Sequence, residues 1–409
     1  MMEKIVEVKS VRAVRGTAGL LLFGICGALF WGMRGAPGYG GISGAVVPGL
    51  IWGLVWYQLV RVAGGTPTVW IVLACTLGFG LGGYNGYGQY ISWIQGVFHI
   101  TYPETSIPIE PWKGYLYLFA TGAGWGGLGG VMLSWIYGER QKWFIQAARL
   151  IVLPAGFLAG NYIVQVRPEL FMPFYGQIPY DAGECSDCVR TFNTTVGLVS
   201  FAFMTVASLL FEALRFNIRS MKIAGTAALG FGIAFAGCAP FHILGTVWPV
   251  FDWWKAWEMS LGFVGGATIW LLFKMYQPLD QEQAQRSPHE SSTAKSLLVD
   301  LPAFLVVVWA FYNSAGVHWG KSIYLHLAVF LMIVPAAGYA VLRRRSRREY
   351  LDSYPYGGIP PRDRLLFPLV SLSIMSLIVI WPGYRIMAVF FLLAASAVFI
   401  HLRLKAGEA

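Results

Sequence analysis

The sequence predicts an all-α integral membrane protein, a helix bundle with about twelve transmembrane spans of roughly 20 residues each. Of its 409 residues, 56% are hydrophobic and only 12% are charged, and the mean hydropathy is +0.57. This composition excludes a soluble globular domain. The predicted spans cover residues 17–33, 43–63, 68–93, 114–137, 149–166, 193–214, 223–247, 257–276, 297–314, 322–342, 365–382 and 386–402.

The distribution of Lys and Arg predicts the orientation of this bundle. No small-residue cleavage site follows the first span, so we interpret it as a retained helix and not as a signal peptide. With the amino terminus inside, seven of the 30 basic residues lie outside and the other 23 lie in the cytoplasm. The seven are Arg34, Lys113, Arg167, Arg190, Lys255, Lys321 and Arg385. Basic residues favour the cytoplasmic side, so the sequence predicts cytoplasmic termini in a multi-pass protein of the cell membrane, either a plasma or an inner membrane.

The distribution of glycine divides the chain into a region predicted to carry the functional site and a region predicted to support it structurally. Of the 49 glycines, 42 precede Pro278. Residues 1–278 therefore form a Gly- and aromatic-rich domain of eight spans, residues 279–296 a polar cytoplasmic linker, and residues 297–409 a plainer domain of four apolar spans. The last four helices are candidates for a contact between copies of the chain.

Basic residues also cluster in the second domain, in a run made of Arg343, Arg344, Arg345, Arg347 and Arg348. Anionic lipid headgroups attract such a run at the cytoplasmic surface. No soluble domain accompanies it, so we expect membrane lipid as a partner and no nucleic acid.

Short repeats and glycine series suggest how the first domain is built. Residues 31–40 and 79–88 share five of ten identities, and Trp112-Lys113 recurs as Trp254-Lys255. A tandem repeat of four plus four spans would explain these matches, and chance in a Gly-rich chain is the alternative. Glycines also recur at every fourth residue: Gly78, Gly82 and Gly86, then Gly122, Gly126 and Gly130. Such series predict close helix packing, with a ligand beside them as the alternative.

Polar and aromatic residues gather between the predicted seventh and eighth spans. Lys255 and Glu258 are three residues apart, so on one helix they share a face and can pair. Asp252 stands where a helix N-cap is expected. His242 and Glu258 are left near the ends of their spans with no structural role beyond satisfying each other. We therefore expect a ligand site here.

Three further residues complete the predicted site. Trp254 belongs to a Trp-rich segment that fits either an interfacial belt or a surface for a ring-bearing ligand. Arg34 follows the first span, where it either anchors in the headgroups or binds a ligand or carboxylate. Asn85 adjoins the first glycine series. The predicted substrate-binding residues are Arg34, Asn85, His242, Trp254, Lys255 and Glu258.

Cys185 and Cys188 form a Cys-x-x-Cys pattern in a segment predicted to lie outside. Oxidising surroundings favour a local disulfide between them. Zinc would need two more ligands, and no Cys or His is near in sequence. We therefore predict neither a metal nor another cofactor.

The sequence leaves three functions open. Twelve spans, the repeat and the glycine series favour a transporter or channel for a small polar solute with a pocket facing outside. One-sided polarity favours a membrane-embedded enzyme on a lipid-linked or periplasmic, sugar-like substrate. His242 or Glu258 would then be the general base, and Arg34 or Lys255 would hold an anionic group. A non-catalytic subunit of a membrane complex is the third.

Overall fold

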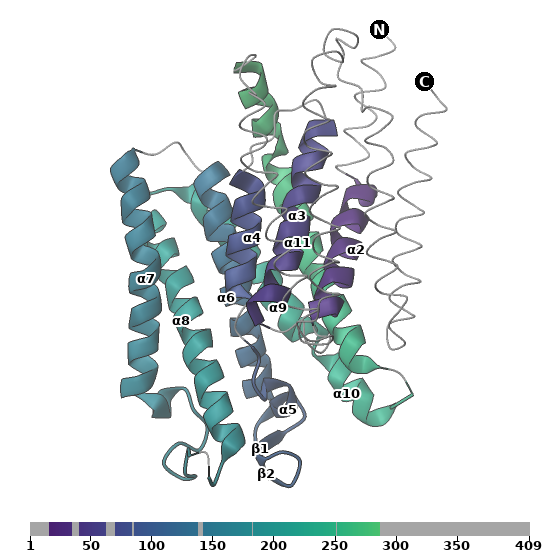
Figure 1. Cartoon of the computed structure of the whole chain (residues 1–409), viewed down its shortest axis with the longest axis vertical. Helices are drawn as coiled ribbons and strands as arrows, with labels where there is room; N and C mark the ends of the chain where they lie inside the picture. Colours follow the sequence, from purple (N-terminus) through teal and green to yellow (C-terminus); the bar gives the residue numbers. More distant parts are fainter. Residues whose placement is uncertain are drawn as a thin grey trace, which may run out of the picture. The chain divides into compact units, whose positions relative to one another are not determined.

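The structure, a computed structural model, describes residues 16–34, 41–62, 70–83, 86–137, 142–181, 183–250 and 252–286 (Figure 1). These residues are mostly helical. Their elements are α2 Thr17–Arg34, α3 Gly41–Val62, α4 Trp70–Gly82, α5 Tyr90–Ile94, β1 Val97–Thr101, β2 Thr105–Pro108, α6 Pro111–Tyr137, α7 Trp143–Val166, the 3-10 helix η1 Pro168–Leu170, α8 Ser186–Leu214, α9 Ile218–Cys238, α10 Pro240–Val247 and α11 Trp253–Arg286.

The chain divides into two compact units, Met1–Gly320 and Lys321–Ala409. All described residues belong to the first unit. The predicted spans from residue 297 onward, and the contact between copies expected of them, lie outside the described residues. Helix α11 continues to Arg286, into the segment predicted as a linker.

Five described segments are long and apolar enough to cross a membrane: Pro111–Tyr137, Phe144–Val166, Ser186–Leu214, Ile218–Val247 and Trp253–Tyr276. Three shorter apolar helices precede them, within α2, α3 and α4. Together these eight segments follow the first eight predicted spans in order. The all-α prediction is confirmed for the described residues, while the total of twelve spans and the repeat stay predictions.

Two predicted spans are interrupted in the structure. The third was expected to run over residues 68–93, but α4 ends at Gly82 and the short helix α5 follows at Tyr90. The seventh is divided between α9 and α10, with Pro240 at the first position of α10. Proline has no N–H to donate, so it fits the first turn of a new helix. The apolar composition of these spans does not by itself predict either helix interruption.

Strands β1 and β2 form an antiparallel hairpin that the sequence analysis did not anticipate, with Phe98 opposite Ile107. The hairpin lies against the start of α8, where the Asp187 carboxylate accepts a hydrogen bond from the Tyr102 N–H at 2.8 Å. Gln89 joins the same region because its side chain bonds both His99 and, at 2.9 Å, the Thr191 hydroxyl.

The hairpin marks one end of the described bundle, which we call the hairpin end. Helices α5 and α10 lie at this end (Figure 1), and the Gln95 side chain of the α5 cap donates to the His242 carbonyl of α10 at 3.3 Å. The segment before α8 also lies at this end, because the Cys185 sulfur is 3.2 Å from the Ile100 carbonyl oxygen of β1. The α8–α9 turn, residues 215–217, lies at the opposite end, here the turn end. Among the described residues, the loops predicted to be external are thus grouped at the hairpin end.

Glycines hold the central helices in close contact. Side chains at Gly122 or Gly126 of α6 would overlap backbone carbonyls of α9, at Phe231 and Ala227 respectively. Gly27 of α2 is pressed in the same way against Gly262 of α11. Lipid tails offer no hydrophobic drive for helix association, so this backbone approach supplies the dispersion contacts.

The first glycine series is shorter than predicted. A Cβ at Gly78 would lie 2.7 Å from the Gly129 Cα, and one at Gly82 would lie 2.8 Å from the Trp125 Cα, so both glycines pack α4 on α6. Gly86 lies beyond the end of α4, and a Cβ there would meet nothing within 4 Å. Including Gly86 in the series was therefore wrong, because the helix ends before it.

Candidate functional site

The amino-terminal turn of α11 places the central residues of the candidate site. The Asp252 carboxylate accepts a hydrogen bond from the Lys255 N–H at 3.0 Å, so Asp252 is the N-cap that its position predicted. The helix therefore starts at Trp253 and carries Lys255 and Glu258 on one face. Their side chains form an ion pair with an N–O distance of 2.6 Å.

Glu258 is the most enclosed member of this group, with only 1% of its surface exposed. Besides Lys255, its carboxylate accepts a hydrogen bond from the Trp254 indole at 2.9 Å and one from the Tyr87 hydroxyl at 3.5 Å. These donors satisfy a charge that would otherwise be costly to bury.

Lys255 connects Glu258 to α2. Its ammonium group also donates to the Gly32 carbonyl at 3.2 Å, and its side chain is 20% exposed. Gly32 lies in the last turn of α2, where carbonyls lack partners within the helix and the helix dipole favours a cation. The close packing of Gly27 on Gly262 brings this turn to Lys255.

His242 lies beside this ion pair on α10. It is 7% exposed, and its ring makes edge contacts with the rings of Trp254 and Trp257 at centroid distances of 4.9 and 4.7 Å. Its Nε2 is buried and has no hydrogen-bond partner among the described residues. The expected pairing of His242 with Glu258 is not among the bonds of either side chain described here. A buried nitrogen in this condition calls for a ligand or a water molecule.

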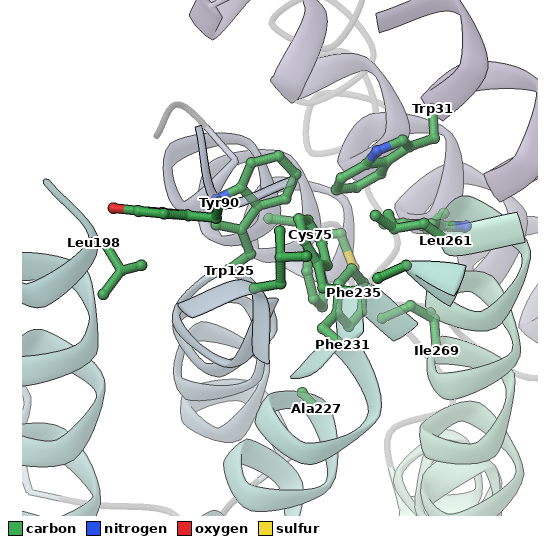
Figure 2. Close-up of a cluster of buried hydrophobic side chains, with 14 of the residues drawn as sticks. Trp31, Cys75, Tyr90, Trp125, Leu198, Ala227, Phe231, Phe235, Leu261 and Ile269 are labelled. Carbon is green, nitrogen blue, oxygen red and sulfur yellow. The ribbon is translucent and has the colours of Figure 1, made fainter. Parts of the chain in front are cut away.

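Aromatic side chains fill the core next to the site. Trp257 is fully buried, and the centroid of its ring lies 6.3 Å from that of Phe235. The Phe235 ring in turn contacts Trp31 and Trp125. Figure 2 shows Trp31, Trp125 and Phe235 in one cluster with Phe231. Trp257 is therefore a core residue of the described bundle. Trp254, in contrast, is 43% exposed.

The structure thus brings four predicted site residues together: His242, Trp254, Lys255 and Glu258. The Arg34 side chain and the whole of Asn85 lie outside the described residues. Tyr87 and Gly32 join the site through contacts between distant segments, which no spacing in the sequence encodes.

Cys185 and Cys188 lie elsewhere at the hairpin end, where they form a disulfide at the start of α8. The Cys185 sulfur also accepts from the Cys188 N–H and so caps the helix. Within the described part of the chain, no group of three or more Cys, His, Asp or Glu residues is placed to hold a metal ion.

A second buried ion pair, which the sequence analysis missed, lies at the turn end between α7 and α8. Arg149 donates to the two oxygens of Glu212 at 2.6 and 3.1 Å. Asn217 donates to the same carboxylate at 2.6 Å, and Arg215 lies 3.5 Å from it. We call these four residues the Arg149 cluster. A rule that charges inside spans seek partners could have flagged Arg149, but only the fold supplies Glu212.

The exposed ion pair Lys113–Glu110 can be compared with the Lys255–Glu258 and Arg149–Glu212 pairs. Lys113 is bonded to Glu110 at 2.8 Å, with side chains 30% and 62% exposed, and this bond lowers the pKa of Glu110. Lys113 follows Trp112 just as Lys255 follows Trp254. The two Trp-Lys matches therefore hold different partners in different surroundings.

Comparisons with protein-family models, with curated proteins and with solved structures found no match to this chain.

Proposed function

We propose that this protein is a multi-pass transporter of the cell membrane for a small polar solute. In this proposal the solute binds among His242, Trp254, Lys255 and Glu258. The observation that carries it is the buried Glu258 carboxylate with its donors. Ionisable groups within membrane segments are costly, and they mark substrate or ion pathways by default.

The contacts of Glu258 support a coupling role. Through Lys255 its charge is linked to the end of α2, and through Tyr87 it is linked to the segment after α4. A change in the charge or partner of this carboxylate would alter contacts among three parts of the chain. Transport requires that ligand binding at one site change the positions of several helices.

The distribution of basic residues supports an external position for the hairpin end. Binding would then occur from outside the cell. The cytoplasmic termini, the cell membrane as location and an association of copies through the last four predicted spans belong to the same proposal.

The direct test is solute flux in proteoliposomes containing the purified full-length protein. Labelled amino acids, sugars and small organic acids are offered in turn, and Glu258→Gln is compared with Glu110→Gln, the exposed counterpart. We expect uptake of at least one solute class by the parent and by Glu110→Gln, and none by Glu258→Gln. Equal uptake by both variants would contradict the proposal.

A membrane-embedded enzyme is the second candidate, and the aromatic packing favours it. Trp31, Trp125, Phe235 and Trp257 fill the core beside the site, as expected of a site open to one side only. His242 could then act as a general base and Lys255 could hold an anionic group. Turnover of an extracted membrane lipid that is lost in both His242→Gln and Lys255→Met, without flux of any solute, would decide for this candidate.

A further inference from the structure

We propose that the turn between α8 and α9 binds an anionic phospholipid of the membrane, with the ring of Phe216 inserted between the acyl chains. This segment, residues 214–218, lies at the turn end, opposite the candidate solute site (Figure 1). The inference goes beyond the proposed function and does not depend on it. It rests on a strained backbone, on exposed apolar side chains and on the charges beside them.

Phe216 stands where a glycine would be less strained. Helix α8 ends at Leu214, and the Phe216 N–H donates to the Ala213 carbonyl at 2.9 Å. The next N–H, that of Asn217, donates to the Glu212 carbonyl at 2.9 Å. These two bonds form the Schellman ending of a helix, which needs a left-handed residue and usually takes glycine. Phe216 adopts this conformation with a φ of 54°, an outlier for a bulky side chain.

The Arg149 cluster fixes this turn in the bundle. The Glu212 carboxylate accepts from Asn217 at 2.6 Å and from Arg149 at 2.6 and 3.1 Å, so the residue after Phe216 is firmly held. Asn217 is 2% exposed, whereas Phe216 is 86% exposed. Backbone strain persists where the surrounding structure imposes it, and it often marks a functional position. Here the strained backbone directs an aromatic ring away from the protein.

Further exposed apolar side chains flank the ring. Leu214 is 80% exposed and Ile218 is 60% exposed. Leu214 is the last residue of one segment that can cross a membrane, and Ile218 is the first residue of the next. Phe216 therefore lies at the depth where the hydrocarbon ends and the headgroups begin. Acyl chains can cover all three side chains at this depth.

The charges beside the ring favour an anionic headgroup. Residues 211–222 contain one acid, Glu212, and three bases, Arg215, Arg219 and Lys222. Glu212 is enclosed in the Arg149 cluster, so the exposed charge of this segment is positive. Lys222 is exposed and follows Ile218 by four residues, so the two side chains share a face of α9. The predicted orientation puts this end in the cytoplasmic leaflet, whose surface is anionic.

The same face of α9 continues as an exposed apolar stripe. Leu229 and Ile233 follow Lys222 by seven and eleven residues, about two and three helical turns, and they are 58% and 60% exposed. A Cβ at Gly225, which lies between them and Lys222 in the sequence, would meet nothing within 4 Å. An acyl chain can therefore lie along this stripe while its headgroup contacts Lys222. This arrangement fits a phospholipid and not a free phosphate.

Native mass spectrometry of the full-length protein in detergent tests the inference. Dioleoyl phosphatidylglycerol and dioleoyl phosphatidylcholine are titrated separately, so the two probes differ in the headgroup alone. We expect the parent to bind phosphatidylglycerol more tightly. Lys222→Met should weaken this binding about fivefold, as expected for one charge near the surface. Lys142→Met removes another exposed lysine of the turn end and should leave it unchanged. Glycerol 3-phosphate, which has no acyl chains, should not displace the lipid.

Phe216→Gly should change stability and lipid binding in opposite directions. Glycine relieves the left-handed strain, so the midpoint temperature of unfolding in lipid-free detergent should rise. Loss of the ring should weaken phosphatidylglycerol binding about tenfold.

Four outcomes would overturn the inference: equal affinity of the parent for the two lipids, displacement by glycerol 3-phosphate, an equal loss in Lys142→Met and Lys222→Met, or unchanged lipid binding in Phe216→Gly. The last outcome would assign the exposed ring to a protein partner.

Discussion

Two ion pairs each hold a buried carboxylate, Arg149–Glu212 at the turn end and Lys255–Glu258 at the hairpin end, yet their cations are held differently. Arg149 is 2% exposed and grips both oxygens of Glu212, which Asn217 also bonds. Lys255 is 20% exposed and holds one oxygen of its partner. The neighbouring Trp254 contacts His242, whose Nε2 has no hydrogen-bond partner in the described part of the chain. A carboxylate bonded on both oxygens, as in Glu212, suits a structural contact between helices. A partly exposed cation such as Lys255 can instead exchange its partner for a ligand.

The largest expected effect is at the turn end. Glu212→Gln leaves the Arg149 charge enclosed without its counterion, so the free energy of unfolding should fall by about 3–5 kcal/mol. Unfolding in mixed micelles with increasing SDS measures it. Glu169→Gln, which breaks an exposed pair with Arg167, is the control and should leave the free energy of unfolding nearly unchanged. Equal losses would remove the contrast between enclosed and exposed pairs.

Helix α9 joins the two ends, because it starts after Asn217 and ends shortly before His242. Its close contact with α6 should therefore matter to both. Gly126→Ala puts a methyl group into the Ala227 carbonyl and should cost about 1–3 kcal/mol. In the same assay Gly225→Ala, where nothing lies within 4 Å, should be neutral or slightly stabilising. If Gly126→Ala leaves the free energy of unfolding unchanged, α6 and α9 can move apart at little cost.

The matching change at the hairpin end should be milder. Glu258→Gln keeps the shape of the side chain, and Lys255 retains the Gly32 carbonyl and partial access to water. We expect a loss of about 1 kcal/mol or less in the same SDS assay, well below that of Glu212→Gln. A loss as large as at Glu212 would make this pair a structural tie as well.

The smallest effect on stability is expected at His242. His242→Leu removes a buried nitrogen that has no partner among the described residues, so unfolding should change by less than about 0.5 kcal/mol or shift toward stability. Solute uptake in proteoliposomes should fall in the same variant. A large loss of stability would mean that the imidazole serves packing against Trp254 and Trp257.

What the sequence could predict depends on the distance over which each feature is formed. The Lys255–Glu258 pair and the Asp252 cap follow from spacings within one helical turn, so both were predictable. Glu212 lies 63 residues from Arg149, and only the packing of α8 on α7 brings them together. The burial of Trp257 and the contact with Tyr87 depend on tertiary structure in the same way.

Helix α8 has 29 residues and so a length of about 44 Å, more than the roughly 30 Å of a hydrocarbon core. Its first turn is closed by the Cys185–Cys188 disulfide and braced by the hairpin. This combination makes a rigid platform at the hairpin end. An antibody fragment bound there would stay fixed relative to the helices, which would give a 45.2 kDa chain the added mass and reference point that single-particle imaging needs.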